Sequence, residues 1–269
     1  MIKHGTLVHF YDHHPRLGRH QVLDARSLDW LHQHDGTALK PAEHQPLIPV
    51  LDQEDLNAQG IHVSKVVAGA EDADALGSCT GNAGTAAVSA LLTAEQAKTA
   101  GLDYTSATAA EEWAIGLYAQ ATGLDSAPGT FPPDDAGSSG LGIAKALKQR
   151  GLIRSYTHAT SVTGLASLLQ NGPVLLGVPW FVAWFEPDAS GFIDRGDWES
   201  SQLAGGHEIC ATALEKVATD WRGQVDPNAS VIRFRNSWST SWGDHGEGRM
   251  SLATYQVLRR YIDAIQLHA

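Results

Sequence analysis

The chain has 269 residues, a formal net charge of −11 and thirteen histidines. This length is enough for one large domain, or for two small lobes with a proper core. The acidic balance and the lack of a Lys/Arg-rich run argue against nucleic acid as a partner, and no apolar run approaches the ~20 residues that span a bilayer.

The chain contains two cysteines, Cys79 and Cys210, which are too few for a disulfide framework. The first residues lack the apolar region and the small-residue cleavage site of a signal peptide. We therefore expect a cytoplasmic protein that keeps its thiols reduced, with no membrane partner, and we expect it to act as a monomer.

The first 50 residues are rich in His and Pro and contain one possible strand, at residues 6–11. The histidines follow no compact ligand spacing and have no cysteines nearby, so we expect solvated side chains and no metal site. The region shows no recognisable inhibitory propeptide, and autoinhibition from this end is not expected. The histidines in question are His4, His9, His13, His14, His20, His32, His34 and His44.

Helices are predicted to dominate the first half of the chain. A run of small residues and helix formers covers residues 79–92. Residues 108–111 have the spacing of a capping box and lead into an amphipathic helix over 112–119. A third helix is predicted over 138–148 and stops at Gly151.

Strands are predicted to dominate the second half, after one short helix at 163–170. Helices followed by strands indicate an α+β protein with two lobes. We expect an N-terminal extension (1–21), a mainly helical lobe (22–150) and a mainly β lobe (151–269) within a single unit. The predicted strands are 174–181, 205–214, 230–235 and 248–252.

Cys79 stands at the first turn of the first predicted helix, behind Gly77 and Ser78. The partial positive charge of a helix N-terminus favours a thiolate, and a nearby imidazolium lowers the thiol pKa further. A small, buried structural cysteine is the alternative. Cys210 lies within an apolar strand, and for it the buried interpretation is preferred.

Two later segments supply partners for a reactive Cys79. His207 opens an apolar strand behind two glycines, and Asn236 ends another strand, with Trp238 and Trp242 following it. A cysteine peptidase needs an imidazole to pair with the thiolate and a group to orient that imidazole. An Asn side-chain oxygen can accept the second ring N–H, and a Trp can shield that hydrogen bond from water.

These segments resemble the papain-like (C1) cysteine peptidases, in particular the compact bacterial and bacteriophage members. The residues that carry the resemblance are Gly77-Ser78-Cys79, Gly205-Gly206-His207 and Asn236-Ser237-Trp238. His207 and Asn236 follow Cys79 by 128 and 157 residues, which matches the roughly 130–150 residues known for papain and the cathepsins. The resemblance implies a helical lobe and an antiparallel, β-barrel-like lobe, with the active-site cleft between them.

The resemblance also implies roles for individual residues. Cys79 would be the nucleophile, His207 the general acid/base and Asn236 its orienting partner, with no metal or organic cofactor. Peptide or protein substrates would bind the cleft as an extended strand. The implied substrate-binding residues are Ser138, Ser139, Gly140, Gly206 and Trp238.

One element of the family pattern is displaced. The family places a Gln of the oxyanion hole six residues before the nucleophile, where this chain has Ala73. Gln53 is the preferred substitute, which would make residues 54–75 an insertion whose simplest interpretation is a tolerated surface loop. Gln59, or no Gln at all, are the alternatives left open.

The activity predicted from these segments is endopeptidase hydrolysis through a thioester acyl-enzyme. Two other functions remain open: a Cys-His amidase that acts on peptidoglycan, and a catalytically impaired protein that binds peptide. Glu208 follows the histidine, where it would tune the pKa of His207 or bind a basic group, or else face solvent. Trp180 and Trp184 are expected in the core or in the cleft wall.

Overall fold

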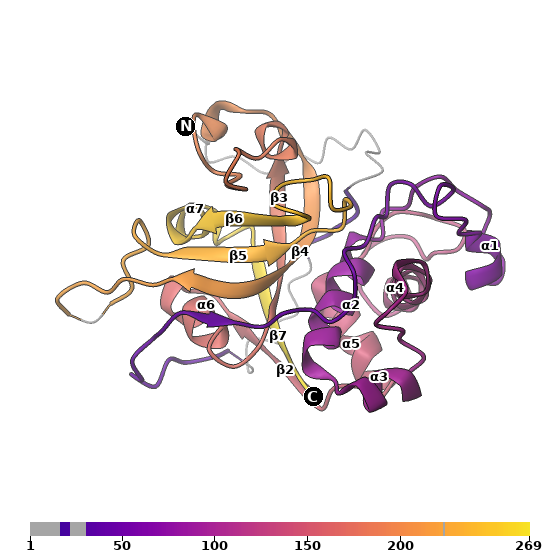
Figure 1. The fold of residues 1–269 in the computed structure, drawn as a ribbon, viewed down its shortest axis with the longest axis horizontal. Helices are drawn as coiled ribbons and strands as arrows, with labels where there is room; N and C mark the ends of the chain where they lie inside the picture. Colours follow the sequence, from indigo (N-terminus) through magenta and orange to yellow (C-terminus); the bar gives the residue numbers. More distant parts are fainter. Residues whose placement is uncertain (1–16, 22–30, 223) are drawn as a thin grey trace.

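The computed structural model describes residues 17–21, 31–222 and 224–269. The strand predicted at 6–11 and the histidines from His4 to His14 lie outside these ranges. Helices α1 to α5 gather on one side of the molecule, and the strands lie on the other side together with α6 and α7 (Figure 1). The predicted α+β class and two-lobe arrangement are therefore confirmed. No helix within the described ranges is long and apolar enough to cross a membrane.

The helical lobe is built around α2, which two neighbouring helices cover (Figure 1). Glycines permit this close approach: a Cβ on Gly81 would overlap the carbonyl of Ala114 in α4, and one on Gly84 would overlap Ile143 in α5. The run of small residues therefore lets α2 pack at the centre of the lobe. The helices are α1 (Val63–Val66), α2 (Cys79–Leu91), α3 (Ala94–Thr99), α4 (Ala107–Thr122) and α5 (Gly140–Gln149).

The start of α4 differs from the prediction. Ser106 is the N-cap and accepts a hydrogen bond from the N–H of Ala109, so Thr108 lies inside the helix and the capping box predicted at 108–111 is wrong. A capping box does form at α3, between Thr93 and Gln96. Glu111 is instead buried and bonds to Asn82 and to the backbone of Asp52, so tertiary contacts rather than local capping decide its place.

The β lobe is one antiparallel sheet with the strand order β2-β7-β3-β4-β5-β6, and β1 pairs with β4. The sheet is open, since no pairing between its edge strands β2 and β6 occurs among the described residues, so the expected barrel-like lobe is not closed. Two short helices, α6 (Val162–Leu168) and α7 (Leu252–Leu258), accompany the sheet. The strands are β1 (Ala42–Glu43), β2 (Ser155–Ala159), β3 (Val174–Phe181), β4 (Leu203–Lys216), β5 (Val231–Arg235), β6 (Glu247–Ser251) and β7 (Asp263–His268).

A continuous apolar core joins the two lobes. Leu175, Cys210 and Ile265 project from three neighbouring strands and pack with the apolar faces of α2 and α5. Each of these three side chains is at most 1% exposed. Because the helices are seated directly on the sheet, α2 is held in a fixed position relative to β4.

The insertion 54–75 has a small core of its own. Leu56, Ile61 and Val63 are each at most 1% exposed and pack against Ile115 and Tyr118 of α4. This packing differs from the tolerated surface loop that was the simplest expectation. Burial of three aliphatic side chains stabilises the insertion by several kcal/mol in order of magnitude.

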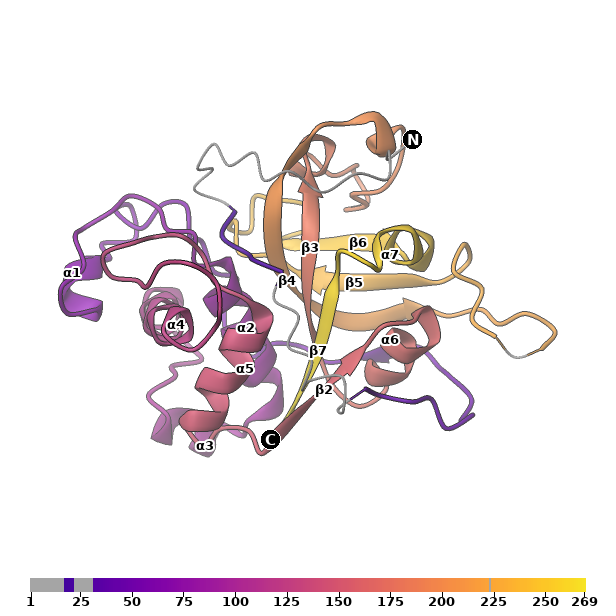
Figure 2. The same ribbon diagram turned by 180° about the vertical axis from the view of Figure 1, so that it is seen from behind.

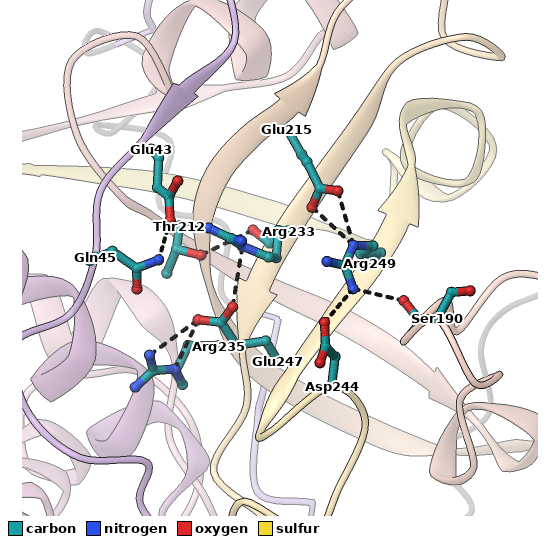
Figure 3. Close-up of polar contacts among 10 residues, drawn as sticks. All are labelled: Glu43, Gln45, Ser190, Thr212, Glu215, Arg233, Arg235, Asp244, Glu247 and Arg249. Atoms are coloured by element: carbon teal, nitrogen blue, oxygen red, sulfur yellow. Dashed lines mark hydrogen bonds and ion pairs between the residues drawn. The ribbon is translucent and has the colours of Figure 1, made fainter.

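Charged side chains form a connected network on β4, β5, β6 and the neighbouring β1 (Figure 3). Glu247 pairs with Arg233 at 3.2 Å and with Arg235 at 3.1 Å, and Arg233 also pairs with Glu43. Arg249 pairs with a separate set of carboxylates, from Glu215 and Asp244. Networks of this kind align neighbouring strands through cross-strand pairs of opposite charge.

Candidate active site

Cys79 is the first residue of α2, as predicted, and Ser78 precedes the helix as its N-cap. The Ser78 hydroxyl donates to Oδ1 of Asn82 at 3.0 Å, and Asn82 in turn donates to Glu111 at 2.6 Å. The approach to the helix is held by Asp135, which accepts the N–H of Gly77 at 2.9 Å. These bonds fix the first turn and direct its backbone N–H groups toward the region around the thiol.

The thiol of Cys79 is fully buried. Burial raises its pKa to about 12, while hydrogen bonds from the backbone N–H groups of Glu208 and Gly18 favour the thiolate and partly offset that effect. The Glu208 contact places the sulfur next to the residue that follows His207. In this form of the protein, the thiol is protonated near neutral pH.

His207 lies on β4 and is held through one ring nitrogen. Its Nε2 is 2.7 Å from Oδ1 of Asn236, and both side chains are buried. Trp238 stacks on the imidazole with ring centroids 4.5 Å apart and an interplanar angle of 24°, and Trp180 meets it edge-on at 4.8 Å. The two indoles keep water from the His207–Asn236 hydrogen bond, which strengthens it.

Gln53 contacts Leu76, three residues before Cys79, and Ser237, next to Asn236. Its Nε2 donates to the carbonyl of Leu76 at 2.9 Å, and its Oε1 accepts from the hydroxyl of Ser237 at 2.6 Å. The carbonyl of Gln53 also accepts the N–H of Leu76, so the insertion leaves and re-enters the site through neighbouring backbone. A primary amide has two N–H donors, and the bond to Leu76 uses one of them.

Gln59, the alternative glutamine, forms its hydrogen bonds elsewhere. Gln59 donates to the carbonyls of Asp52 and Asp55, at 2.6 Å and 3.1 Å, within the first turn of the insertion. Its amide is therefore engaged with the insertion's own backbone. The packing brings Gln53, rather than Gln59, against the residues that flank the nucleophile.

Residues 17–21 run between β4 and the helical lobe (Figure 2), and the backbone N–H of Gly18 contacts the Cys79 thiol. Arg19 donates its N–H to the carbonyl of Gly206 at 3.2 Å, and the segment forms a parallel bridge to Ser138. Ser138 donates to the carbonyl of Gly18 at 2.7 Å and accepts the N–H of His20 at 2.6 Å. No autoinhibition was expected from this end of the chain, whereas the structure places Gly18 against Cys79 and Arg19 against Gly206.

The contact at Gly18 is made by backbone. A Cβ on Gly18 would overlap the carbonyl of Gly77, and a Cβ on Gly137 would overlap the carbonyl of Gly18. Glycine is therefore required for the segment to lie this close to the nucleophile. Polar side chains then anchor the segment, since His20 contacts the carbonyl of Ala136 and Gln21 donates to that of Arg260 at 3.0 Å.

The five residues predicted to bind substrate have four different kinds of surroundings. Ser138 and Gly206 offer backbone groups that the 17–21 segment now uses. Ser139 caps α5 through the N–H of Gly142, Gly140 abuts the Glu208 carboxylate, and Trp238 covers His207. Only the first two therefore present main-chain hydrogen-bonding groups to an extended chain in this structure.

Two acidic side chains, Glu208 and Asp263, lie beside Arg19, and only Glu208 was considered from the sequence. Glu208 is buried rather than solvent-facing, and burial raises its pKa to about 8, while the Arg19 guanidinium partly offsets the rise. Asp263, at the start of β7, forms an ion pair with Arg19. No local pattern in the sequence links Asp263 to the active site, because the contact arises from strand pairing.

Cys210, His32 and His34, the other candidate residues, make contacts of a structural kind. Cys210 is fully buried in the core, where burial raises its pKa to about 12. His32 and His34 both contact the hydroxyl of Ser167, at 2.9 Å and 3.2 Å. Within the described part of the chain, no group of three or more His, Cys, Asp or Glu side chains has an arrangement that could hold a metal ion.

Comparison with solved structures identifies the architecture. The chain superposes on xylellain, a cysteine protease from Xylella fastidiosa, with a TM-score of 0.62 and 15% identity, over 94% of this chain and 96% of that chain. The chain has the papain-like fold. At this level of identity, the papain-like likeness concerns the fold alone.

Two further papain-like proteases align less well. Procathepsin L 3 of Tenebrio molitor aligns at 12% identity over 95% of this chain and 77% of its own, with a TM-score of 0.46. The ragweed pollen protease Amb a 11, in its proform, aligns at 11% identity over 87% and 66%, with a TM-score of 0.49. No protein family and no curated protein matches the sequence itself.

Proposed function

We propose that this papain-like chain is a cysteine endopeptidase in which Cys79 is the nucleophile, His207 the general acid/base and Asn236 the orienting partner. The observation that carries the proposal is the buried His207–Asn236 hydrogen bond of 2.7 Å. The residue after His207, Glu208, contacts the Cys79 thiol through its backbone N–H. A structural histidine has no need of a stacked indole and an Asn partner beside a helix-N-terminal cysteine.

The first half of the reaction forms the acyl-enzyme. Because Nε2 of His207 is held by Asn236, Nδ1 takes the proton from the Cys79 thiol. The thiolate attacks the substrate carbonyl carbon and forms a C–S bond, and the carbonyl π electrons move to oxygen. The backbone N–H of Cys79 and the second amide N–H of Gln53 stabilise that oxyanion.

The tetrahedral intermediate then collapses. Its C–N bond breaks, and the His207 imidazolium gives its proton to the leaving amine, which leaves a thioester on Cys79. In the second half, His207 takes a proton from water, and the resulting hydroxide attacks the thioester. The C–S bond breaks, the carboxylic acid product leaves, and the Cys79 thiol is restored.

The 17–21 segment makes this a latent form of the enzyme. It occupies the backbone groups of Ser138 and Gly206 and covers a thiol whose pKa is raised to about 12. A substrate therefore binds after the segment has moved away. Peptide or protein is the substrate class, because main-chain hydrogen bonds to Ser138 and Gly206 suit an extended polypeptide.

The test is hydrolysis of quenched fluorescent peptides by the full chain carrying Gly18→Ala, which displaces the segment. We expect turnover that disappears in Gly18→Ala/Cys79→Ala and falls by several orders of magnitude in Gly18→Ala/His207→Ala. Labelling of Cys79 by an epoxysuccinyl probe, read by mass spectrometry, monitors the nucleophile directly. A Gly18→Ala chain that exposes Cys79 yet cleaves none of the peptides refutes the proposal and favours a peptide-binding protein.

A further inference from the structure

The side chain of Arg19 fills an acidic pocket beside the nucleophile. Arg19 is only 6% exposed; its guanidinium pairs with Asp263 and donates to the carbonyl of Tyr261 at 3.2 Å. Glu208 is 1% exposed, and neither of its carboxylate oxygens accepts a hydrogen bond from the described residues. The pocket therefore holds two buried acidic groups and one buried cation.

Strand register builds the pocket. Gly177 on β3 pairs with Glu208 on β4 at one side and with Asp263 on β7 at the other. A Cβ on Gly177 would overlap Arg19 Nε, and it would lie 2.7 Å from Asp263 Oδ1 and 2.8 Å from Glu208 Oε2. The glycine between two carboxylates leaves the space that a long side chain occupies.

The charges of the pocket select its occupant. A buried carboxylate without a compensating partner is costly, and two of them on either side of β3 also repel each other. A neutral side chain in this space would leave both groups uncompensated. The Arg19 guanidinium pairs with Asp263 and places its positive charge near Glu208, and a guanidinium is more weakly hydrated than an ammonium.

The backbone contacts of Arg19 show how a second chain would reach the pocket. Arg19 enters it from the position bridged to Ser138, with its N–H on the carbonyl of Gly206. A substrate bound to the same backbone groups places one of its own side chains over the pocket. Once the 17–21 segment has left, that side chain replaces Arg19 between Glu208 and Asp263.

We propose that Glu208 and Asp263 select an arginine in the substrate, at the residue that pairs with Ser138, and that Arg19 is the built-in occupant of this site. The inference rests on the proposed peptidase function and names its substrate class. Removal of one partner from a buried, hydrogen-bonded charge pair costs on the order of 30-fold or more in binding. We expect a discrimination of that size between arginine and a neutral side chain.

The test uses the full chain with Gly18→Ala/Arg19→Ala, which empties the pocket. Two acyloxymethyl ketone peptides that differ only in arginine or leucine at the second residue from the reactive group report the rate of Cys79 labelling. We expect the arginine probe to react at least ~30-fold faster. Adding Glu208→Gln or Asp263→Asn should remove most of this preference, so that the ratio of the arginine-probe rate to the leucine-probe rate falls toward one.

Binding without catalysis gives an independent measurement. Agmatine, which carries a guanidinium on a four-carbon chain, should raise the melting temperature of Cys79→Ala/Gly18→Ala/Arg19→Ala. It should have no such effect on Cys79→Ala alone, where Arg19 fills the pocket. This measurement also covers the case in which Asp263→Asn fails to fold.

The outcomes separate the two proposals. Equal rates for both probes, with agmatine inert, overturn the arginine pocket and leave the peptidase intact. If iodoacetamide labels Cys79 and both peptide probes fail, the peptidase proposal falls, and the arginine-selective substrate site falls with it. An arginine preference that survives both Glu208→Gln and Asp263→Asn also overturns the assignment of the pocket.

Discussion

Gly18→Ala should convert Cys79 from an inert thiol into a reactive one. The Cβ introduced at Gly18 overlaps the carbonyl of Gly77. The atoms that it meets belong to the backbone, so no flexible side chain can move aside to relieve the overlap. The 17–21 segment must therefore move away from the nucleophile. The perturbation is small, but it acts at the point where the segment touches the approach to α2.

The size of the effect follows from the burial of the thiol. Burial raises the pKa of Cys79 to about 12 from its ordinary 9.0. Exposure that restores the ordinary pKa raises the thiolate fraction near pH 8 about 1,000-fold, and the rate of alkylation follows the thiolate. Pairing with the His207 imidazolium would raise the rate further.

The assay is the second-order rate of iodoacetamide alkylation at pH 8, with the modified cysteine located by mass spectrometry so that Cys210 is distinguished from Cys79. Gly116→Ala is the matched control, because a Cβ on Gly116 has open space around it. Gly116→Ala should react as slowly as the wild type. A folded Gly18→Ala chain that also reacts as slowly as the wild type refutes the view that the 17–21 segment shields the nucleophile.

Three further predictions concern the surroundings of the nucleophile. In the Gly18→Ala chain, Gln53→Ala should lower kcat about 100- to 1,000-fold with little change in KM, and an unchanged kcat in peptide hydrolysis would exclude Gln53 from the oxyanion hole. Burial raises the pKa of Glu111 to about 7 from 4.5, so the folded protein holds a proton that the unfolded chain releases. The free energy of unfolding should therefore fall by about 3 kcal/mol as the pH rises from 4.5 to 7, and urea titrations should show no such fall for Glu111→Gln. Gly81→Ala should cost about 1–3 kcal/mol of stability, because its Cβ overlaps the carbonyl of Ala114; a denaturation midpoint equal to that of the wild type would contradict this packing.

Local patterns in the sequence were enough to find Cys79, His207 and Asn236 as candidates. Cys79 begins α2, Asn236 follows β5 and His207 lies within β4 behind two glycines, and such positions are marked by glycines, small residues and apolar periodicity nearby. The helix-then-strand order likewise gave the α+β class. The same local reasoning failed at α4, where Ser106 caps the helix in place of Thr108.

The surroundings of these three residues depended on contacts between distant segments. Gln53 reaches the site because its backbone pairs with Leu76, across an insertion that carries its own core. The linear pattern favoured Gln53 over Gln59 but gave neither a position in the fold. In the structure Gln53 bonds to Leu76 and Ser237, while Gln59 bonds to the insertion's own backbone, and apolar side chains of the insertion are buried against α4.

The sequence by itself thus determined which residues are chemically suited to cysteine peptidase chemistry, and in which lobes they lie. The tertiary structure alone decided that residues 17–21 lie against Cys79, and that Glu208 and Asp263 enclose Arg19. These features arise from the register of β3, β4 and β7 and from the close approach of Gly18 to Gly77. Register and backbone approach are set by the packing of segments far apart in the chain, and no periodicity within one segment encodes them.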